Sequence, residues 1–421
     1  MRDTVVRTRA GDVRGRWSDE VACFLGIPYA TAGRFEVPTP VAPWDGVRDA
    51  LAFGPTAPGA ELLPSEYGPS PKIPGDEWLN LNVWTPSLTG DQPVLVWIHG
   101  GANTMGSSAQ PVFDGTAFAR DGVVFVSVNY RLGVEGFGQL PDAPANRGRR
   151  DQIAALEWVR DNISAFGGDP GNVTVAGISA GAGAVLALLS LDTGLFRRAV
   201  IQSGLLHSAH AANDAALVTA EVARRACVEP TAAALRAVDP DKLAGLAHAV
   251  DGEVGANPDA ALWGASVVAT GMGFSTVIDG SLVTGDPWQR VLDGVGEDMD
   301  LLVGLASDEL LRMLPGAPDQ AAALTDAMFR RPVHELAAGR AGRTFVYEFG
   351  WPSPLPGVGA AHGLDVGFVF DTLGNCPLEG DDPPQRLADT VHRAWVEFVR
   401  DGNPGWPAYP STTRFESPDP V

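Results

Sequence analysis

The pentapeptide at positions 177–181, Gly-Ile-Ser-Ala-Gly, restricts the fold of this chain more than any other segment. It directly follows a short apolar run at 173–176 and directly precedes an Ala- and Leu-rich run at 182–191. The order strand, Gly-x-Ser-x-Gly, helix predicts a very tight turn that points the serine hydroxyl away from both elements. Because strand and helix then pass close together, only small residues fit on either side of Ser179, as Gly177 and Gly181 do.

A second buried strand leads into a glycine loop earlier in the chain. The run at 94–98 reads Val-Leu-Val-Trp-Ile, and His-Gly-Gly-Ala follows at 99–102. Backbone amides in such a loop can hold a negative charge that develops on a reacting oxygen. Two independent parts of one device in the right order predict an activated serine beside an oxyanion hole.

Length and composition indicate a large globular protein. The chain has 421 residues, which by length alone fits two or three domains. However, no Ser/Gly tract, charge block or repeat interrupts the pattern, so we expect a single α/β domain over residues 1–421. The 45% of apolar and 19% of charged residues suffice for a large core and are unlike a disordered chain.

The charge balance argues against nucleic acid as a partner. The formal net charge is −21, with two lysines beside 28 arginines. Affinity for a phosphate backbone comes from Lys and Arg that displace counterions, so such an acidic chain is poorly suited to it.

The cysteines and the N-terminus carry no special signal. Cys23, Cys227 and Cys376 are widely separated and odd in number, so we expect no disulfide framework and no metal site. We also expect no cofactor. The uncharged stretch 170–191 is long enough for a membrane helix but contains several glycines and polar residues, which favour a strand, a turn and a helix. We see no signal peptide and expect a cytoplasmic protein without a membrane partner.

Apolar runs along the chain indicate strands that alternate with helices. The short apolar, β-branched runs that suit central strands are 79–84, 94–99, 123–129, 173–176, 199–202, 301–304 and 344–349. Apolar residues at helical spacing occur within 152–166 and 391–399, and 4–25 alternates as small antiparallel strands do. This order predicts a mostly parallel central sheet flanked by helices. The Ala-rich stretch 207–269, helical without obvious strands, is expected to form a cap over the carboxyl ends of the strands.

Further segments carry a family resemblance almost from end to end. The most distinctive ones are 24–30 (Phe-Leu-Gly-Ile-Pro-Tyr-Ala), 79–83 (Leu-Asn-Leu-Asn-Val), 129–133 (Asn-Tyr-Arg-Leu-Gly), 165–170 (Ala-Phe-Gly-Gly-Asp-Pro), 202–204 (Gln-Ser-Gly) and 406–409 (Trp-Pro-Ala-Tyr). With the two glycine motifs they resemble the type-B carboxylesterase family, the esterase and lipase group that includes cholinesterases and bacterial para-nitrobenzyl-type esterases. The resemblance implies an α/β-hydrolase fold with a reduced helical cap over 205–275 and a shortened cap or wall segment over 305–361.

The resemblance also implies a catalytic triad in the chain order serine, acid, histidine. Ser179 is then the nucleophile, and His362, late in the chain in a glycine-flanked loop, matches the family's catalytic histidine. The family places the acid second in an Asp-Glu pair after a strand, which maps onto Glu309, although Leu310 replaces the usual glycine. Asp308 is the alternative acid, and a merely solvated acidic turn is the other interpretation of this pair.

Main-chain donors complete the expected site. The resemblance implies an oxyanion hole formed by the amides of Gly101, Ala102 and Ala180. Ala180 opens a helix whose unpaired amides and positive dipole end face the site, which agrees with this role. The implied activity is that of a serine carboxylesterase acting through an acyl-enzyme on small-molecule esters, with short-chain or aryl esters and broad tolerance expected.

Some residues depart from the family pattern. Ile178 stands where relatives usually carry a glutamate, and the loop 54–75 lacks the tryptophan that choline-binding relatives use for a cation–π contact. Both differences argue against a cholinesterase. An amide or carbamate hydrolase with the same triad remains an alternative, as does a non-catalytic cholinesterase-like binding module. The sequence does not determine the oligomeric state.

Overall fold

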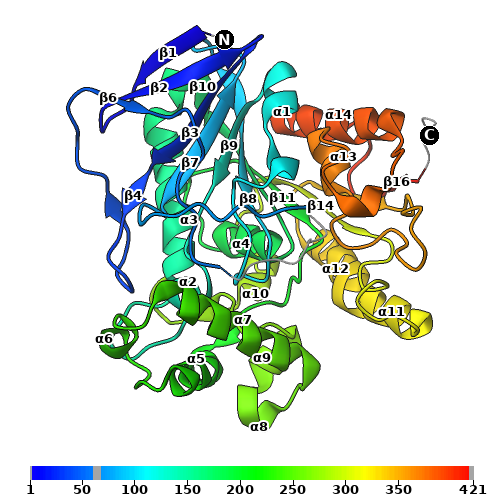
Figure 1. The fold of residues 1–421 in the computed structure, drawn as a ribbon. Helices are drawn as coiled ribbons and strands as arrows, with labels where there is room; N and C mark the ends of the chain where they lie inside the picture. Colours follow the sequence, from blue (N-terminus) through cyan, green and yellow to red (C-terminus); the bar gives the residue numbers. More distant parts are fainter. Residues whose placement is uncertain (1, 60–67, 417–421) are drawn as a thin grey trace.

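The structure is a computed structural model that describes residues 2–59 and 68–416. A large twisted sheet runs through the described part of the chain (Figure 1). Its twelve strands are β1 (Arg2–Arg7), β2 (Asp12–Ser18), β3 (Val21–Pro28), β6 (Val47–Asp49), β7 (Asn80–Thr85), β8 (Gln92–Ile98), β9 (Val124–Val128), β10 (Gly168–Ile178), β11 (Arg198–Gln202), β14 (Asp300–Ala306), β15 (Thr344–Phe349) and β16 (Thr412–Phe415).

The strand order confirms the predicted sheet. It runs β1-β2-β3-β7-β9-β8-β10-β11-β14-β15-β16, with β6 beside β2. Pairing is antiparallel from β1 to β9 along this path and parallel from β9 to β16. All seven predicted central runs form strands. The edge strand β16 was not predicted, because its four residues, Thr-Thr-Arg-Phe, have no apolar pattern and only one buried side chain.

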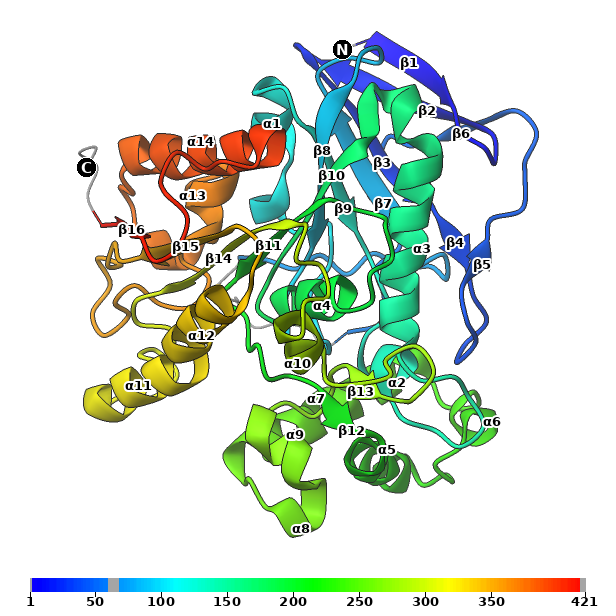
Figure 2. The same ribbon diagram turned by 180° about the vertical axis from the view of Figure 1, so that it is seen from behind.

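Helices cover both faces of the sheet (Figures 1 and 2). One face carries α1 (Thr116–Arg120), α13 (Val366–Phe370) and α14 (Gln385–Asp401). The other carries α3 (Arg147–Asn162), α4 (Ala180–Leu189), α10 (Pro287–Leu292) and α12 (Arg331–Gly339). Side chains alternate along β8. Leu95 and Trp97 pack into the core under α1, α13 and α14, and Val96 and Ile98 pack into the core on the opposite face. Because both faces are covered, the strand is buried throughout its apolar run and therefore does not alternate in polarity.

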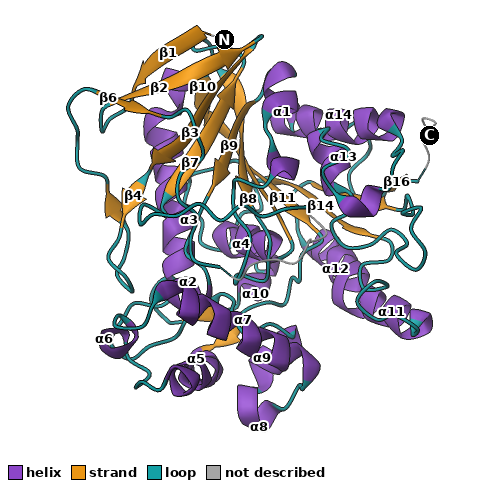
Figure 3. Cartoon of the chain, viewed as in Figure 1, coloured by secondary structure: helices purple, strands orange, loops and turns teal. Residues whose placement is uncertain are grey.

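A group of helices lies beyond one end of the sheet (Figure 3). It consists of α2 (Gly133–Phe137), α5 (Ala212–Ala226), α6 (Ala232–Leu235), α7 (Pro240–Ala256), α8 (Ala260–Trp263) and α9 (Ala265–Thr270). The stretch expected to be helical without strands also contains the two-residue strand β12 (His210–Ala211), which pairs with β13 (Val277–Ile278). This pairing joins residues 67 apart in sequence, so no local pattern indicates it.

Shorter elements complete the described chain. The strands β4 (Ala30–Thr31) and β5 (Thr39–Pro40) form a small hairpin, and α11 (Pro318–Thr325) continues through one π-helical turn, Asp326–Arg330, into α12. Single 3₁₀ turns occupy Pro111–Phe113, Ile163–Phe166 and Pro377–Glu379. Among the helices of residues 2–59 and 68–416, none is both long and apolar enough to cross a bilayer.

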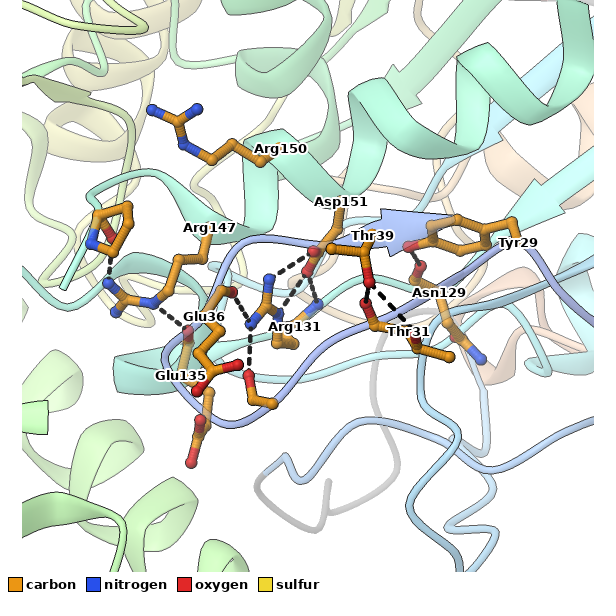
Figure 4. A network of polar contacts seen from close by, with 12 residues as sticks. Tyr29, Thr31, Glu36, Thr39, Asn129, Arg131, Glu135, Arg147, Arg150 and Asp151 are labelled. Atoms are coloured by element: carbon orange, nitrogen blue, oxygen red, sulfur yellow. Dashed lines mark hydrogen bonds and ion pairs between the residues drawn. The ribbon is translucent and has the colours of Figure 1, made fainter. Parts of the chain in front are cut away.

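A buried ion pair joins the segment after β9 to helix α3 (Figure 4). The Arg131 guanidinium binds the Asp151 carboxylate through both branches, at 2.8 and 2.7 Å, and also donates to the carbonyl oxygen of Glu36 at 2.7 Å. Both side chains of the pair are buried. A two-branched, charge-assisted contact of this kind has a defined geometry, so it sets how the end of β9 meets the start of α3.

Candidate active site

Ser179 lies at the tip of the sharp turn between β10 and α4. Its backbone has φ 58° and ψ −123°, a conformation that non-glycine residues rarely adopt. The turn is held because the Ser179 amide donates to the carbonyl oxygen of Gln202 at 3.0 Å and the Gly183 amide donates to the carbonyl oxygen of Ser179 at 3.0 Å. Strain of this type at the end of a buried strand is a feature of functional sites.

Gly177 allows the close approach of strand and helix that the sequence predicts, and Gly181 allows a second close approach, to the end of β8. A Cβ atom on Gly181 would lie 2.2 Å from the carbonyl oxygen of Ile98, and one on Gly177 would lie 2.5 Å from the carbonyl oxygen of Gly181. Both distances are too short for any side chain. The helix α4 therefore begins in direct contact with the end of β8, which brings the serine turn against the glycine loop.

The glycine loop after β8 has an unusual backbone. Gly101, Ala102 and Asn103 follow one another with φ of 108°, 51° and 57°. The Gly101 carbonyl oxygen accepts the amides of Thr104 and Met105, both at 3.0 Å, which closes the loop. Within the described residues, the amides of Gly101 and Ala102 donate to no protein acceptor, and the Ala180 amide is the first of helix α4. These three amides are therefore free to bind an external oxygen.

His99 holds the start of the glycine loop in place. Its Nδ1 donates to the carbonyl oxygen of Gly100 at 2.8 Å, and its ring stacks on Tyr130 with centroids 4.5 Å apart. Tyr130 in turn donates its hydroxyl to the carbonyl oxygen of His99 at 2.8 Å. Burial lowers the pKa of His99 to about 4, so the ring is neutral at pH 7. This agrees with a role for His99 in shaping the loop.

His362 and Glu309 lie side by side, although 53 residues separate them in sequence. The Nδ1 atom of His362 lies 2.5 Å from Oε2 of Glu309. The other carboxylate oxygen of Glu309 accepts the Ala306 amide at 2.9 Å. Glu309 is fully buried and His362 is 7% exposed, so the ring reaches the cavity while the carboxylate stays behind it. Asp308, the alternative acid, binds the backbone of Ala360 instead.

A cavity of about 350 Å³ joins Ser179, Ala180 and His362. Apart from these residues its wall is mainly apolar, and most of its apolar side chains come from the segment after Glu309. The apolar side chains that line it are Leu205, Met272, Leu310, Met313, Leu314, Leu324, Met328 and Phe329. Sequence analysis did not single out these residues, because apolar residues in a short wall segment look the same as core residues.

Asp365 is a buried carboxyl group next to this site that sequence analysis missed. It is fully buried and accepts the Tyr347 hydroxyl at 3.3 Å. Burial and the nearby Glu309 carboxylate raise the pKa of Asp365 to about 6. An acidic residue among apolar neighbours, three positions after His362, was the signal in the sequence.

The raised pKa of Asp365 predicts a pH-dependent stability. The folded protein holds this proton up to about pH 6, whereas the unfolded chain loses it near pH 3.8. Folding therefore carries a penalty above pH 6 that shrinks as the pH falls toward 4. We expect Asp365→Asn to raise the free energy of unfolding clearly at pH 8 and less at pH 5, as measured by urea unfolding. An effect of equal size at both pH values would contradict this prediction.

Metal coordination finds no support in the described residues. Among residues 2–59 and 68–416, no group of three or more His, Cys, Asp or Glu side chains has an arrangement that could hold a metal ion.

Comparison with known proteins places the chain in a family. The sequence profile described as "Carboxylesterase family" matches residues 2–323. The chain belongs to the carboxylesterase family. It is a carboxylic ester hydrolase.

Individual relatives of this carboxylesterase span nearly the whole chain. A para-nitrobenzyl esterase from Bacillus subtilis (strain 168) is 31% identical over 98% of this chain and 94% of its own length. A phenmedipham hydrolase from Pseudarthrobacter oxydans is 32% identical, over 99% and 94%. A solved structure of a PNB esterase superposes with a TM-score of 0.87 at 29% identity, covering 98% of this chain and 96% of that protein. The α/β-hydrolase fold expected from the sequence is therefore confirmed.

Proposed function

We propose that this carboxylesterase uses Ser179 as its nucleophile, His362 as general base and acid, and Glu309 as the partner of the imidazole. The observation that carries the proposal is the contact between His362 Nδ1 and the buried Glu309 carboxylate, at the wall of the cavity that Ser179 also lines. A carboxylate at Nδ1 keeps the proton on that nitrogen. The other ring nitrogen, Nε2, can then accept the serine proton.

The chemical steps follow from these positions. Ser179 attacks the ester carbonyl while His362 accepts its proton, and the tetrahedral oxyanion binds the amides of Gly101, Ala102 and Ala180. His362 then protonates the leaving alcohol, and an acyl-serine remains. Water attacks the acyl-serine while His362 removes its proton. The bond to the Ser179 oxygen then breaks, His362 returns the proton to that oxygen, and the acid product leaves.

The cavity supports small neutral esters as substrates. His362 is the only ionisable side chain among the residues that line it in the described chain. A charged acyl or alcohol group would lose its hydration there without gaining a partner of opposite charge. The flexible methionine and leucine side chains adapt to different shapes, which supports tolerance for short-chain and aryl esters.

Two insertions would build this cavity. The segment 205–275 contributes Leu205 and Met272, and the segment 305–361 contributes Met313, Met328 and Phe329. We therefore propose the first segment as the cap and the second as the wall of a single domain.

Covalent labelling and a matched pair of substrates test the proposal. A fluorophosphonate reagent should inactivate the enzyme and label Ser179, as located by peptide mass spectrometry. Activity should be high on para-nitrophenyl acetate and low on para-nitroacetanilide, which has the same acyl group. Faster hydrolysis of the anilide would favour the amidase alternative. Inactivation with a label on a different residue would refute the nucleophile, and a chain that neither reacts nor hydrolyses would be the binding module.

A further inference from the structure

The turn that follows β14 is attached to two neighbouring segments by consecutive residues. The Ser307 amide donates to the carbonyl oxygen of Phe349, at the end of β15, at 2.8 Å. The next amide, that of Asp308, donates to the carbonyl oxygen of Ala360 at 3.0 Å. Glu309 follows and faces His362. The turn therefore contacts the histidine loop through both Asp308 and Glu309, at two different points.

The Asp308 side chain adds a second hydrogen bond to the contact with Ala360. Its Oδ2 accepts the amide of Ala360 at 2.9 Å, while its own amide donates to the carbonyl oxygen of the same residue. Both backbone groups of Ala360 are thus held by one residue. Ala360 precedes His362 by two positions, so this pair of bonds determines where the histidine loop lies relative to Glu309.

Gly359 allows the loop to approach the Asp308 carboxylate. It has φ 64°, and a Cβ atom there would lie 2.6 Å from Oδ2 of Asp308. By contrast, Gly357 in the same loop has a similar φ of 76° and open space around its missing Cβ. The close packing is therefore specific to the position that faces Asp308.

The turn itself has a firm support on its other side. The Ser307 hydroxyl and the Arg330 guanidinium both donate to Oε1 of Glu348, each at 2.8 Å. Arg330 also donates to the carbonyl oxygen of Ser307 at 3.2 Å. Because the turn is fixed to β15 and to the start of α12, a bond from it can hold the histidine loop in place.

We propose that Asp308 is a positioning residue for His362, which holds the histidine loop through both backbone groups of Ala360 so that the imidazole meets Glu309. Asp308 acts through the backbone and not as the acid of the triad, since its carboxylate faces an amide. The inference rests on the proposed function, because it assigns His362 the role of base. A displacement of about 1 Å at a catalytic group can cost about 10²-fold in rate, which is the scale of effect expected here.

Two substitutions at Asp308 test this role. Asp308→Ala removes the acceptor, and kcat for para-nitrophenyl acetate should fall about 10- to 100-fold with little change in KM. The acidic limb of the kcat/KM profile should move to lower pH, because His362 loses part of its contact with Glu309. Asp308→Asn keeps an acceptor oxygen for the Ala360 amide and should restore most of the activity.

A second pair of variants probes the same contact from the loop. Gly359→Ala pushes against the Asp308 carboxylate and should lower kcat, whereas Gly357→Ala carries a similar backbone strain in open space and should lower it far less. Thermal unfolding of each variant identifies any that fail to fold.

Three results would overturn the inference: a fully active Asp308→Ala enzyme, an Asn variant as inactive as the Ala variant, or equal effects at Gly357 and Gly359. In the first case, provided that Ser179→Ala is inactive, the proposed function stands and only the positioning role fails. If wild type and Ser179→Ala are equally active, the proposed function itself fails.

Discussion

Ser179→Ala should lower kcat for para-nitrophenyl acetate by about 10⁶-fold, the scale seen when the nucleophile of another serine hydrolase is removed. Alanine keeps the backbone of the turn and the cavity wall but leaves no oxygen to form the acyl-enzyme. The residual rate would come from the oxyanion amides and from substrate binding alone. Initial rates of para-nitrophenol release at substrate saturation measure the effect.

Ser190→Ala is a matched control for this substitution. Ser190 follows the last residue of the same helix, α4, and its hydroxyl donates to the carbonyl oxygen of Ala187 at 2.7 Å. Its loss should cost about 1 kcal/mol of stability and leave activity intact. If Ser179→Ala retains the wild-type rate while folding normally, Ser179 is not the nucleophile.

Glu309→Gln should lower kcat by about 10⁴-fold, as the acid-to-amide change does in a comparable triad. The glutamine amide group can donate a hydrogen bond to Nδ1 of His362, which favours the tautomer that carries its proton on Nε2 and cannot accept one from Ser179. The variant also loses the negative charge that stabilises the imidazolium. Stopped-flow or prolonged steady-state assays cover the range of rates required.

Asp308→Asn provides the matched comparison, since it makes the same chemical change one position earlier in the chain. We expect it to retain most of its activity, because an asparagine oxygen can still accept the Ala360 amide. If instead Asp308→Asn is inactive and Glu309→Gln is active, the acid of the triad is Asp308, and the alternative left open by the sequence is the correct one.

Local patterns in the sequence predicted the elements around the site. The close contact of Gly177 with Gly181 lies within the pentapeptide, which was sufficient to predict it, whereas the contact of Gly181 with Ile98 on β8 joins segments that are distant in sequence. The central strands were predictable because burial on both faces requires continuous apolar runs. In contrast, β12 and β16 have two and four residues, which is too short for a pattern to develop.

The sequence by itself determined a serine at a strained strand–helix turn, a glycine loop before it and a mostly parallel sheet, since each depends on residues that are neighbours in the chain. It left Glu309 and Asp308 as alternatives for the acid, because two adjacent carboxyl groups look alike without their surroundings. Only the tertiary structure brought Glu309 to His362 and Asp308 to Ala360, collected the apolar cavity wall and buried Asp365. These contacts join segments that are distant in sequence, and their geometry depends on how strands β14 and β15 pair, which no local pattern records.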